Sequence, residues 1–152
     1  MENLEYKINE IAFETAQFLD KTEINKLLGV LASDGVYAMW VWAVDKLKKD
    51  NQKDNMGLFI EQVFSLSEFF PTLKADLSKM KEINDKVKEY LKENLNDSEK
   101  KELKKRIKER NQTILKTFQK LSQNMDELLF FKEILERVLI LARYHAKAMG
   151  EE

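Results

Sequence analysis

Glycine and proline are scarce in this chain, with 4 Gly and 1 Pro among 152 residues. Average usage of these two residues is roughly 12%, which would give about eighteen. A β-sandwich or barrel needs turn residues every ~8–12 positions, and a doubly wound α/β fold needs glycines after its strands. The scarcity therefore disfavours both architectures and favours a helical fold.

The remaining composition supports helices. The chain has 20 Leu, 22 Lys and 18 Glu, straight-chain residues that lose little rotamer freedom in a helix. Hydrophobic residues make up 43%, enough for one real core at this length. We predict an all-α protein in which residues 1–152 form one domain, a bundle of about six helices that includes a long basic helical hairpin.

Capping and turn signals divide the chain. Asp20 with Glu23, and Asn96 with Glu99, have the spacing of a capping box, and Gly35 predicts a break or kink. A polar loop is expected over 50–55. The expected helices are 2–19, 20–31, 36–49, 58–70, 72–95, a basic helix that follows the turn at 96–99 and ends at 121, and 127–149.

The net charge of −1 hides an uneven distribution. Residues 98–121 hold nine Lys or Arg and three Glu, so this segment is +6 and the rest is −7. On a helical wheel, Arg110 lies almost within the apolar stripe and most of the lysines lie opposite it. Lysine suits contact with a phosphate backbone better than it suits base reading. We therefore predict sequence-independent RNA binding by Lys101, Lys104, Lys105 and Lys108; the alternative is a solvated face that only aids solubility.

Catalytic and metal-binding signals are weak. The chain has one His and no Cys, which excludes thiolate zinc sites and two-histidine metal sites within one chain. All-helical nucleotide pyrophosphohydrolases bind magnesium through Glu-x-x-Glu followed by Glu-x-x-Asp, and here the order is reversed. The pairs concerned are Glu82/Asp85, Glu99/Glu102 and Glu133/Glu136. We expect no enzyme activity, no cofactor and no metal; a magnesium-dependent nucleotide hydrolase is a distant alternative.

Two further features bear on location and partners. The longest uncharged run, over 35–44, has about half of the ~20 residues that a membrane-spanning helix needs. Four Glu near the N-terminus interrupt the apolar stretch that a signal peptide would require there. These features predict a soluble, cytoplasmic protein with no membrane partner. Tyr37, Trp40 and Trp42 in that run are either a base-stacking platform or core or subunit-contact residues, and the second interpretation is the one we favour. His145 is expected near a helix C-terminus, where the dipole favours an imidazolium.

Two segments resemble a known family. Leu31-Ala32-Ser33-Asp34-Gly35-Val36, followed by Trp40, Trp42 and Lys46, is similar to a segment of the small all-helical subunit of type III-B CRISPR effector complexes, the fifth Cmr subunit. The closing helix, with Arg143 and the Ala146-Lys147-Ala148-Met149 ending, resembles the closing helix of that family. The family often has two adjacent arginines there, whereas here Tyr144 follows Arg143.

The resemblance implies a non-catalytic subunit that stacks in several copies within an RNA-targeting ribonucleoprotein. Its partners would be the other subunits of the complex, copies of itself, and the backbone of guide or target RNA. The resemblance adds Lys46, Arg143 and Lys147 to the candidate RNA contacts. The competing interpretation is a helical protein–protein interaction module without nucleic acid.

Overall fold

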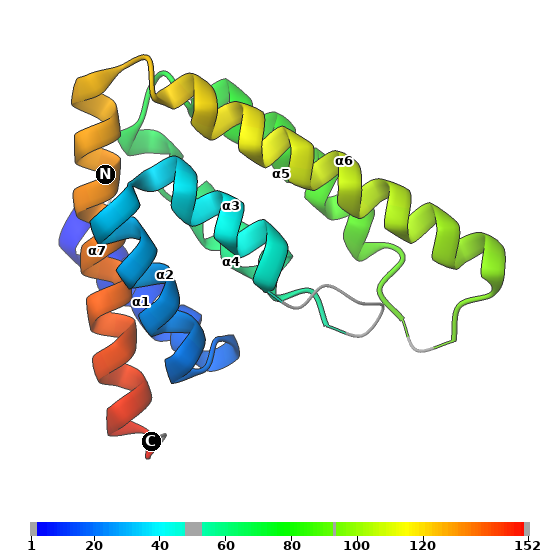
Figure 1. Cartoon of the computed structure of the whole chain (residues 1–152), viewed down its shortest axis with the longest axis horizontal. Coiled ribbons are helices and arrows are strands. Elements are labelled where there is room, and N and C mark those ends of the chain that lie inside the picture. Colours follow the sequence, from blue (N-terminus) through cyan, green and yellow to red (C-terminus); the bar gives the residue numbers. More distant parts are fainter. Residues whose placement is uncertain (1–2, 48–52, 93, 151–152) are drawn as a thin grey trace.

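The computed structural model describes residues 3–47, 53–92 and 94–150. Over these residues the backbone forms seven α-helices, one short 3-10 helix and no strand, which confirms the all-α prediction (Figure 1). In chain order the elements are α1 (Leu4–Phe18), α2 (Lys21–Asp34), α3 (Val36–Lys46), α4 (Asn55–Phe64), η1 (Ser67–Phe69), α5 (Lys74–Lys88), α6 (Asp97–Leu121) and α7 (Met125–Ala148).

Both predicted capping boxes are present. At the start of α2, the Glu23 N–H donates to Asp20 Oδ1 at 2.8 Å and the Asp20 N–H donates to Glu23 Oε1 at 3.0 Å. At the start of α6, Asn96 and Glu99 exchange the same two bonds at 2.8 and 3.1 Å. Each box gives two backbone N–H donors a hydrogen-bond acceptor that an uncapped helix end would leave to solvent.

Gly35 separates α2 from α3. Its φ is +99° and its ψ is −179°, a backbone conformation that is essentially restricted to glycine. Its N–H donates to the carbonyls of Val30 and Leu31 at the end of α2, and its own carbonyl accepts from Met39 in α3. The helices on either side of Gly35 are therefore two helices rather than one kinked helix.

Several expected boundaries were wrong. Helix α4 ends at Phe64 and α5 at Lys88, both earlier than expected, and α7 begins at Met125. Asp54 and Asn55, placed in a polar loop from the sequence, are 5% and 8% exposed, because Asp54 caps α4 from inside the protein. Residues 50–52 of that expected loop lie outside the described ranges.

Helices α1 and α7 lie side by side and parallel, as three contacts show. Arg137 pairs with Glu5, the His145 ring packs edge-on against Phe13 with centroids 5.7 Å apart, and Gln17 donates to Met149 Sδ at 3.5 Å. Each pair has the same offset in the chain, so the two helices run in the same direction. His145 thus lies in the last turn of α7, as expected, and is half-buried.

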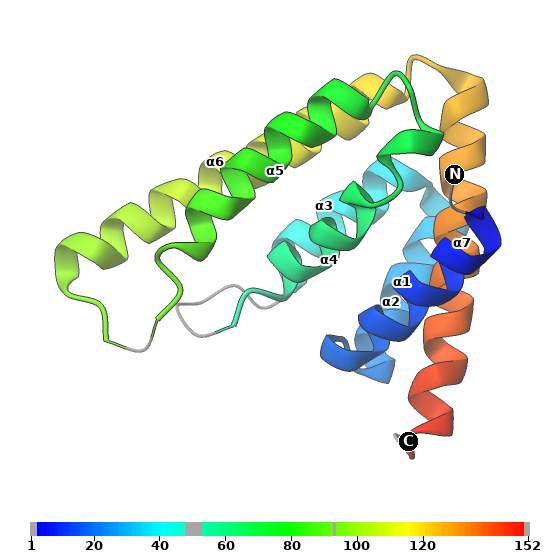
Figure 2. The ribbon, with the colours of Figure 1, turned by 180° about the vertical axis from the view of Figure 1, so that it is seen from behind.

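Helices α5 and α6 form the predicted hairpin. Arg106 lies over the Tyr90 ring and Lys120 pairs with Asp76. A later residue of α6 thus contacts an earlier residue of the α5 segment, so the two helices are antiparallel. Figures 1 and 2 show this antiparallel pair projecting beyond the other helices at the end of the hairpin where α5 ends and α6 begins. We call this projecting end the open end of the hairpin.

The core is centred on aromatic rings. Trp40 of α3 stacks on Phe118 of α6 with centroids 4.7 Å apart, and it also contacts Phe59 of α4. Phe118 contacts Phe131 of α7, which in turn contacts Phe70. This run of rings joins α3, α4, α6 and α7, and it confirms the core interpretation of Trp40.

Candidate nucleic-acid interface

The apolar stripe of α6 orients its cations. Leu103, Ile114, Phe118 and Leu121 are buried, as the spacing predicts. Because 3.6 residues complete a turn, burying this stripe turns most of the lysines of the helix to the outside. All seven lysines of α6 are exposed.

Cations on the α5 side of the helix are already paired. Arg106 Nε donates to Glu102 at 3.0 Å and its guanidinium lies 4.9 Å from the Tyr90 ring centroid. Lys120 Nζ is 3.4 Å from Asp76 of α5. These two side chains each have a contact with α5 or the residues that follow it, and they contribute less free positive charge than an unpaired lysine.

Six lysines on the remaining sector of α6 have no acidic partner among the described residues. They span about 160° of the helical wheel, bordered by Glu109. We call them the lysine face; they are Lys100, Lys101, Lys104, Lys105, Lys108 and Lys116. The four α6 residues predicted as RNA contacts all belong to it.

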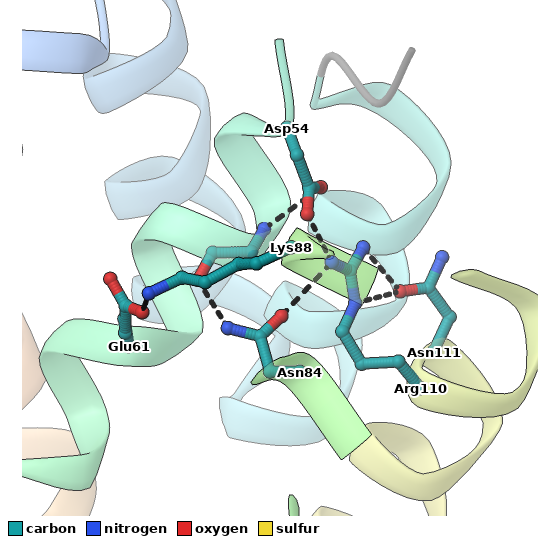
Figure 3. Close-up of polar contacts among 7 residues, drawn as sticks. Asp54, Glu61, Asn84, Lys88, Arg110 and Asn111 are labelled. Atoms are coloured by element: carbon teal, nitrogen blue, oxygen red, sulfur yellow. Dashed lines mark hydrogen bonds and ion pairs between the residues drawn. The ribbon is translucent and has the colours of Figure 1, made fainter. Parts of the chain in front are cut away.

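Arg110 does not belong to this face, although its charge counted toward the predicted basic helix. It is 0% exposed and pairs with the Asp54 carboxylate (Figure 3). Its Nη1 also donates to Asn84 Oδ1, and its Nε and Nη2 donate to Asn111 Oδ1, each at 3.1 Å. Asn84 completes the network by donating to the Gly57 carbonyl at 3.3 Å. Asp54 thus neutralises Arg110, and the charge of the surface comes from lysines.

Gly57 allows this network to form at the start of α4. A Cβ on this residue would overlap the Asp54 carboxylate and lie 2.8 Å from Arg110 Nη1. The Gly57 N–H also donates to Asp54 Oδ1 at 3.1 Å, which makes Asp54 both the helix cap and the partner of Arg110. A side chain at this position would push the two charges apart.

A groove of about 420 Å³ runs beside the lysine face, between α6 and the end of α3. Val44, Ile107 and Leu115 give it half-buried apolar walls. Lys104, Lys108, Asn111 and Gln112 provide the polar part of its lining. The groove therefore combines an aliphatic surface with positive charge.

The three residues added by family resemblance lie elsewhere. Lys46 is exposed in the last turn of α3, pairs with Asp45 at 3.5 Å and does not line the groove. Arg143 and Lys147 lie in the C-terminal half of α7, at the end of the molecule far from the open end of the hairpin (Figures 1 and 2). The Arg143 guanidinium is 5.9 Å from the ring of Tyr144, the residue that replaces a second arginine. These residues do not join the lysine face into one surface.

Three carboxylates of the pairs that suggested a magnesium site, Glu99, Glu102 and Glu136, have other contacts. Glu102 pairs with Arg106, and Glu136 lies 3.8 Å from Lys132. The Lys92 side chain and the Asn96 N–H both donate to Glu99, which holds the pKa of that carboxyl below its ordinary value of 4.5. Within the described ranges, no three His, Cys, Asp or Glu side chains are grouped so that they could hold a metal ion.

The buried network around Arg110 was not predicted from the sequence, although one signal pointed to it. An arginine within the apolar stripe of an amphipathic helix needs a buried acidic partner, since an unpaired charge is costly away from water. Asp54 lies 56 positions away in the chain, so no local pattern identifies it.

None of the helices in the described ranges combines the length and hydropathy needed to cross a bilayer. The chain matches no protein-family model, and neither a curated protein nor a solved structure is significantly similar to it.

Proposed function

We propose that this chain is a non-catalytic subunit that binds the phosphate backbone of single-stranded RNA along the lysine face of α6. The observation that carries the proposal is the set of six exposed lysines without acidic partners among the described residues, in a chain whose net charge is −1. Each lysine that contacts a phosphate releases a condensed counterion, which drives binding without reading sequence.

The resemblance to the small subunit of type III-B CRISPR complexes supports a more specific proposal. In it, the strand is guide or target RNA, and the protein partners are the other subunits and further copies of this chain. Gly35, which the resembling segment contains, sets the break between α2 and α3. Co-expression with the remaining subunits of a type III-B complex should give an assembly that contains this chain.

A protein–protein interaction module is the second candidate. Three large apolar side chains on the first turns of α7 are exposed, Met125 at 61%, Leu129 at 55% and Phe130 at 38%. Apolar side chains gathered in this way are typical of surfaces that contact other proteins. In the subunit proposal they would contact neighbouring subunits, so the two candidates differ in RNA binding alone.

The test replaces Lys101, Lys105 and Lys108 together by Glu and measures RNA affinity by fluorescence anisotropy at several salt concentrations. About four phosphate contacts give the wild-type protein a slope near −3 in log K against log salt, at roughly −0.7 per contact. The variant should bind every sequence more weakly and lose about two units of slope. Its melting temperature should change little, because the three side chains are solvated.

The matched control replaces Lys79, Lys81 and Lys86 of α5 by Glu, since these lysines are also exposed and the charge change is identical. Control and wild type should bind RNA alike. Equal losses in both variants would indicate a general charge effect, and wild-type binding by the α6 variant would favour the interaction module. RNA should be recovered intact with or without magnesium, because the proposed subunit is non-catalytic.

A further inference from the structure

We propose that the groove between α3 and α6 receives one base of the bound strand, and that Asn111 donates a hydrogen bond to an acceptor atom on the edge of that base. This inference rests on the proposed RNA binding and adds a base subsite to a surface otherwise expected to contact phosphates only. It does not require reading of a defined sequence.

The orientation of the Asn111 amide follows from the chemistry of its neighbour. A guanidinium has five N–H donors and no acceptor, so the oxygen of Asn111 must face Arg110. Two bonds, from Nε and Nη2 at 3.1 Å each, hold that oxygen. Figure 3 accordingly shows the amide nitrogen of Asn111 pointing away from Arg110.

Asn111 is only 7% exposed, and its NH2 group, which has no acceptor among the described residues, opens onto the groove, where solvent reaches it. Since Asn111 lines the groove, a molecule that occupies the groove can supply the missing acceptor. Uracil and cytosine carbonyls, the guanine O6 and the N7 of purines are all such acceptors.

Arg110 acts here as a positioning residue. Its guanidinium is held by Asp54 and by Asn84 Oδ1 on the side opposite Asn111, so it cannot follow the Asn111 side chain if that amide turns. The NH2 donor is therefore fixed before a ligand arrives. A donor that is already oriented binds without the loss of side-chain freedom that a mobile one undergoes.

The shape and charge of the groove match a base attached to a phosphate backbone. Val44, Ile107 and Leu115 offer aliphatic walls against which the face of a base can pack and bury its apolar surface. Lys104 and Lys108, one helical turn apart, can reach the phosphates on either side of that base. An apolar protein segment would cover the same walls but would bury Lys104 and Lys108 without a negatively charged partner.

The experiment compares two oligonucleotides of equal length and equal charge, an oligouridylate and its abasic counterpart. Wild-type protein should bind the oligouridylate at least fivefold more tightly, because the abasic strand keeps the phosphates and lacks the bases. The ratio of the two affinities isolates the base contribution, since a change in protein charge affects both strands alike. The side-chain 15N–H2 resonances of Asn111 should shift with the oligouridylate and stay in place with the abasic strand.

Two variants locate the effect. Asn111→Asp keeps the oxygen that faces Arg110 and replaces the donor by an acceptor, so the affinity ratio should fall to about one. Leu115→Gln makes one wall of the groove polar at nearly constant size and should lower the ratio as well. Because Leu115 is only half-buried, it also serves if Asn111→Asp does not fold.

The outcomes separate the two proposals. Failure of both strands to bind wild-type protein at low salt would overturn the proposed function. Equal binding of both strands would leave backbone binding intact and overturn the base subsite. A wild-type ratio that persists in both variants would mean that bases are contacted elsewhere, which would also overturn the subsite.

Discussion

The open end of the α5–α6 hairpin and the rest of the molecule are held together in different ways. The main core continues through every α-helix and includes the run of rings from Phe59 to Phe131. Among the described residues at the open end, Val87, Leu95 and Leu103 form a separate and much smaller buried cluster. Tyr90, Leu91 and Ile107, all half-buried, pack around them. The end that carries most of the lysine face therefore has little apolar burial of its own.

A polar layer separates the two cores. Along α5, Asn84 lies between Met80 of the main core and Val87 of the small one. Along α6, Arg110 lies between Leu103 and Ile114 in the same way. The comparison teaches that a helix can pass from a large core to a small one through a satisfied polar network, which specifies one register where apolar side chains alone would allow others.

The largest expected effect comes from breaking that layer. Arg110→Met leaves the Asp54 carboxylate buried without its partner, so the free energy of unfolding should fall by about 3–5 kcal/mol. Urea denaturation at pH 7 measures the loss. Lys108→Met on the same helix is the control and should change stability by no more than about 0.5 kcal/mol.

The double variant Asp54→Asn with Arg110→Met gives the sharper result. It should lose less than the sum of the two single variants, because the two residues share one interaction. A loss below about 1 kcal/mol for Arg110→Met alone would contradict the view that this layer joins the two cores.

A second pair of variants compares the two cores directly. Leu27 of α2 is 0% exposed in the main core, and Leu103 is 5% exposed in the small core. Leu27→Ala should cost about 4 kcal/mol and Leu103→Ala about 2 kcal/mol, since fewer neighbours surround the cavity at the open end. Equal losses in urea denaturation would mean that the open end is as well packed as the rest. Native-state hydrogen exchange should show the first turns of α6 opening before α2 does.

A third comparison concerns two glycines, Gly29 within α2 and Gly35 at its C-terminal end. A Cβ would meet nothing within 4 Å at Gly29 or at Gly35, so space does not distinguish them. Gly35 has φ +99°, and Gly35→Ala should destabilise by about 1–3 kcal/mol through backbone strain. Gly29 lies within α2, and Gly29→Ala should stabilise by about 0.5–1 kcal/mol. Thermal melts that move in the same direction would contradict the assignment of strain to Gly35.

The smallest expected effect is a pH dependence at the open end. Hydrogen bonds from Lys92 and from the Asn96 N–H lower the pKa of Glu99 in the folded protein. The ionised carboxylate therefore stabilises the fold at pH values above 4.5, and this contribution disappears as the pH falls through the lowered pKa. Glu99→Gln keeps the capping geometry without the charge. It should be slightly less stable than wild type at pH 7 and equally stable below that lowered pKa; a constant difference across pH would contradict the assignment.

Local chemistry made much of the fold predictable. Asp20 and Asn96 start helices, and Gly35 separates two, because capping and backbone freedom depend on residues only a few positions apart. The apolar stripe of α6 was equally predictable from the sequence. The stripe in turn predicted the exposure of the four lysines Lys101, Lys104, Lys105 and Lys108. Burial on one face of a helix forces the opposite face outward, whatever it packs against.

The pairing of distant residues was decided only by the tertiary structure. The sequence by itself determined an all-helical chain with a basic helix, since both follow from composition and from short-range spacing. It could not show that Arg110 faces inward to Asp54, that Asn111 turns its NH2 group away from Arg110, or that Lys46, Arg143 and Lys147 lie apart from the lysine face. Those facts depend on which helices pack together and in what register. A charged side chain can be buried only where the fold places an oppositely charged partner next to it, and that partner can lie far away in the sequence.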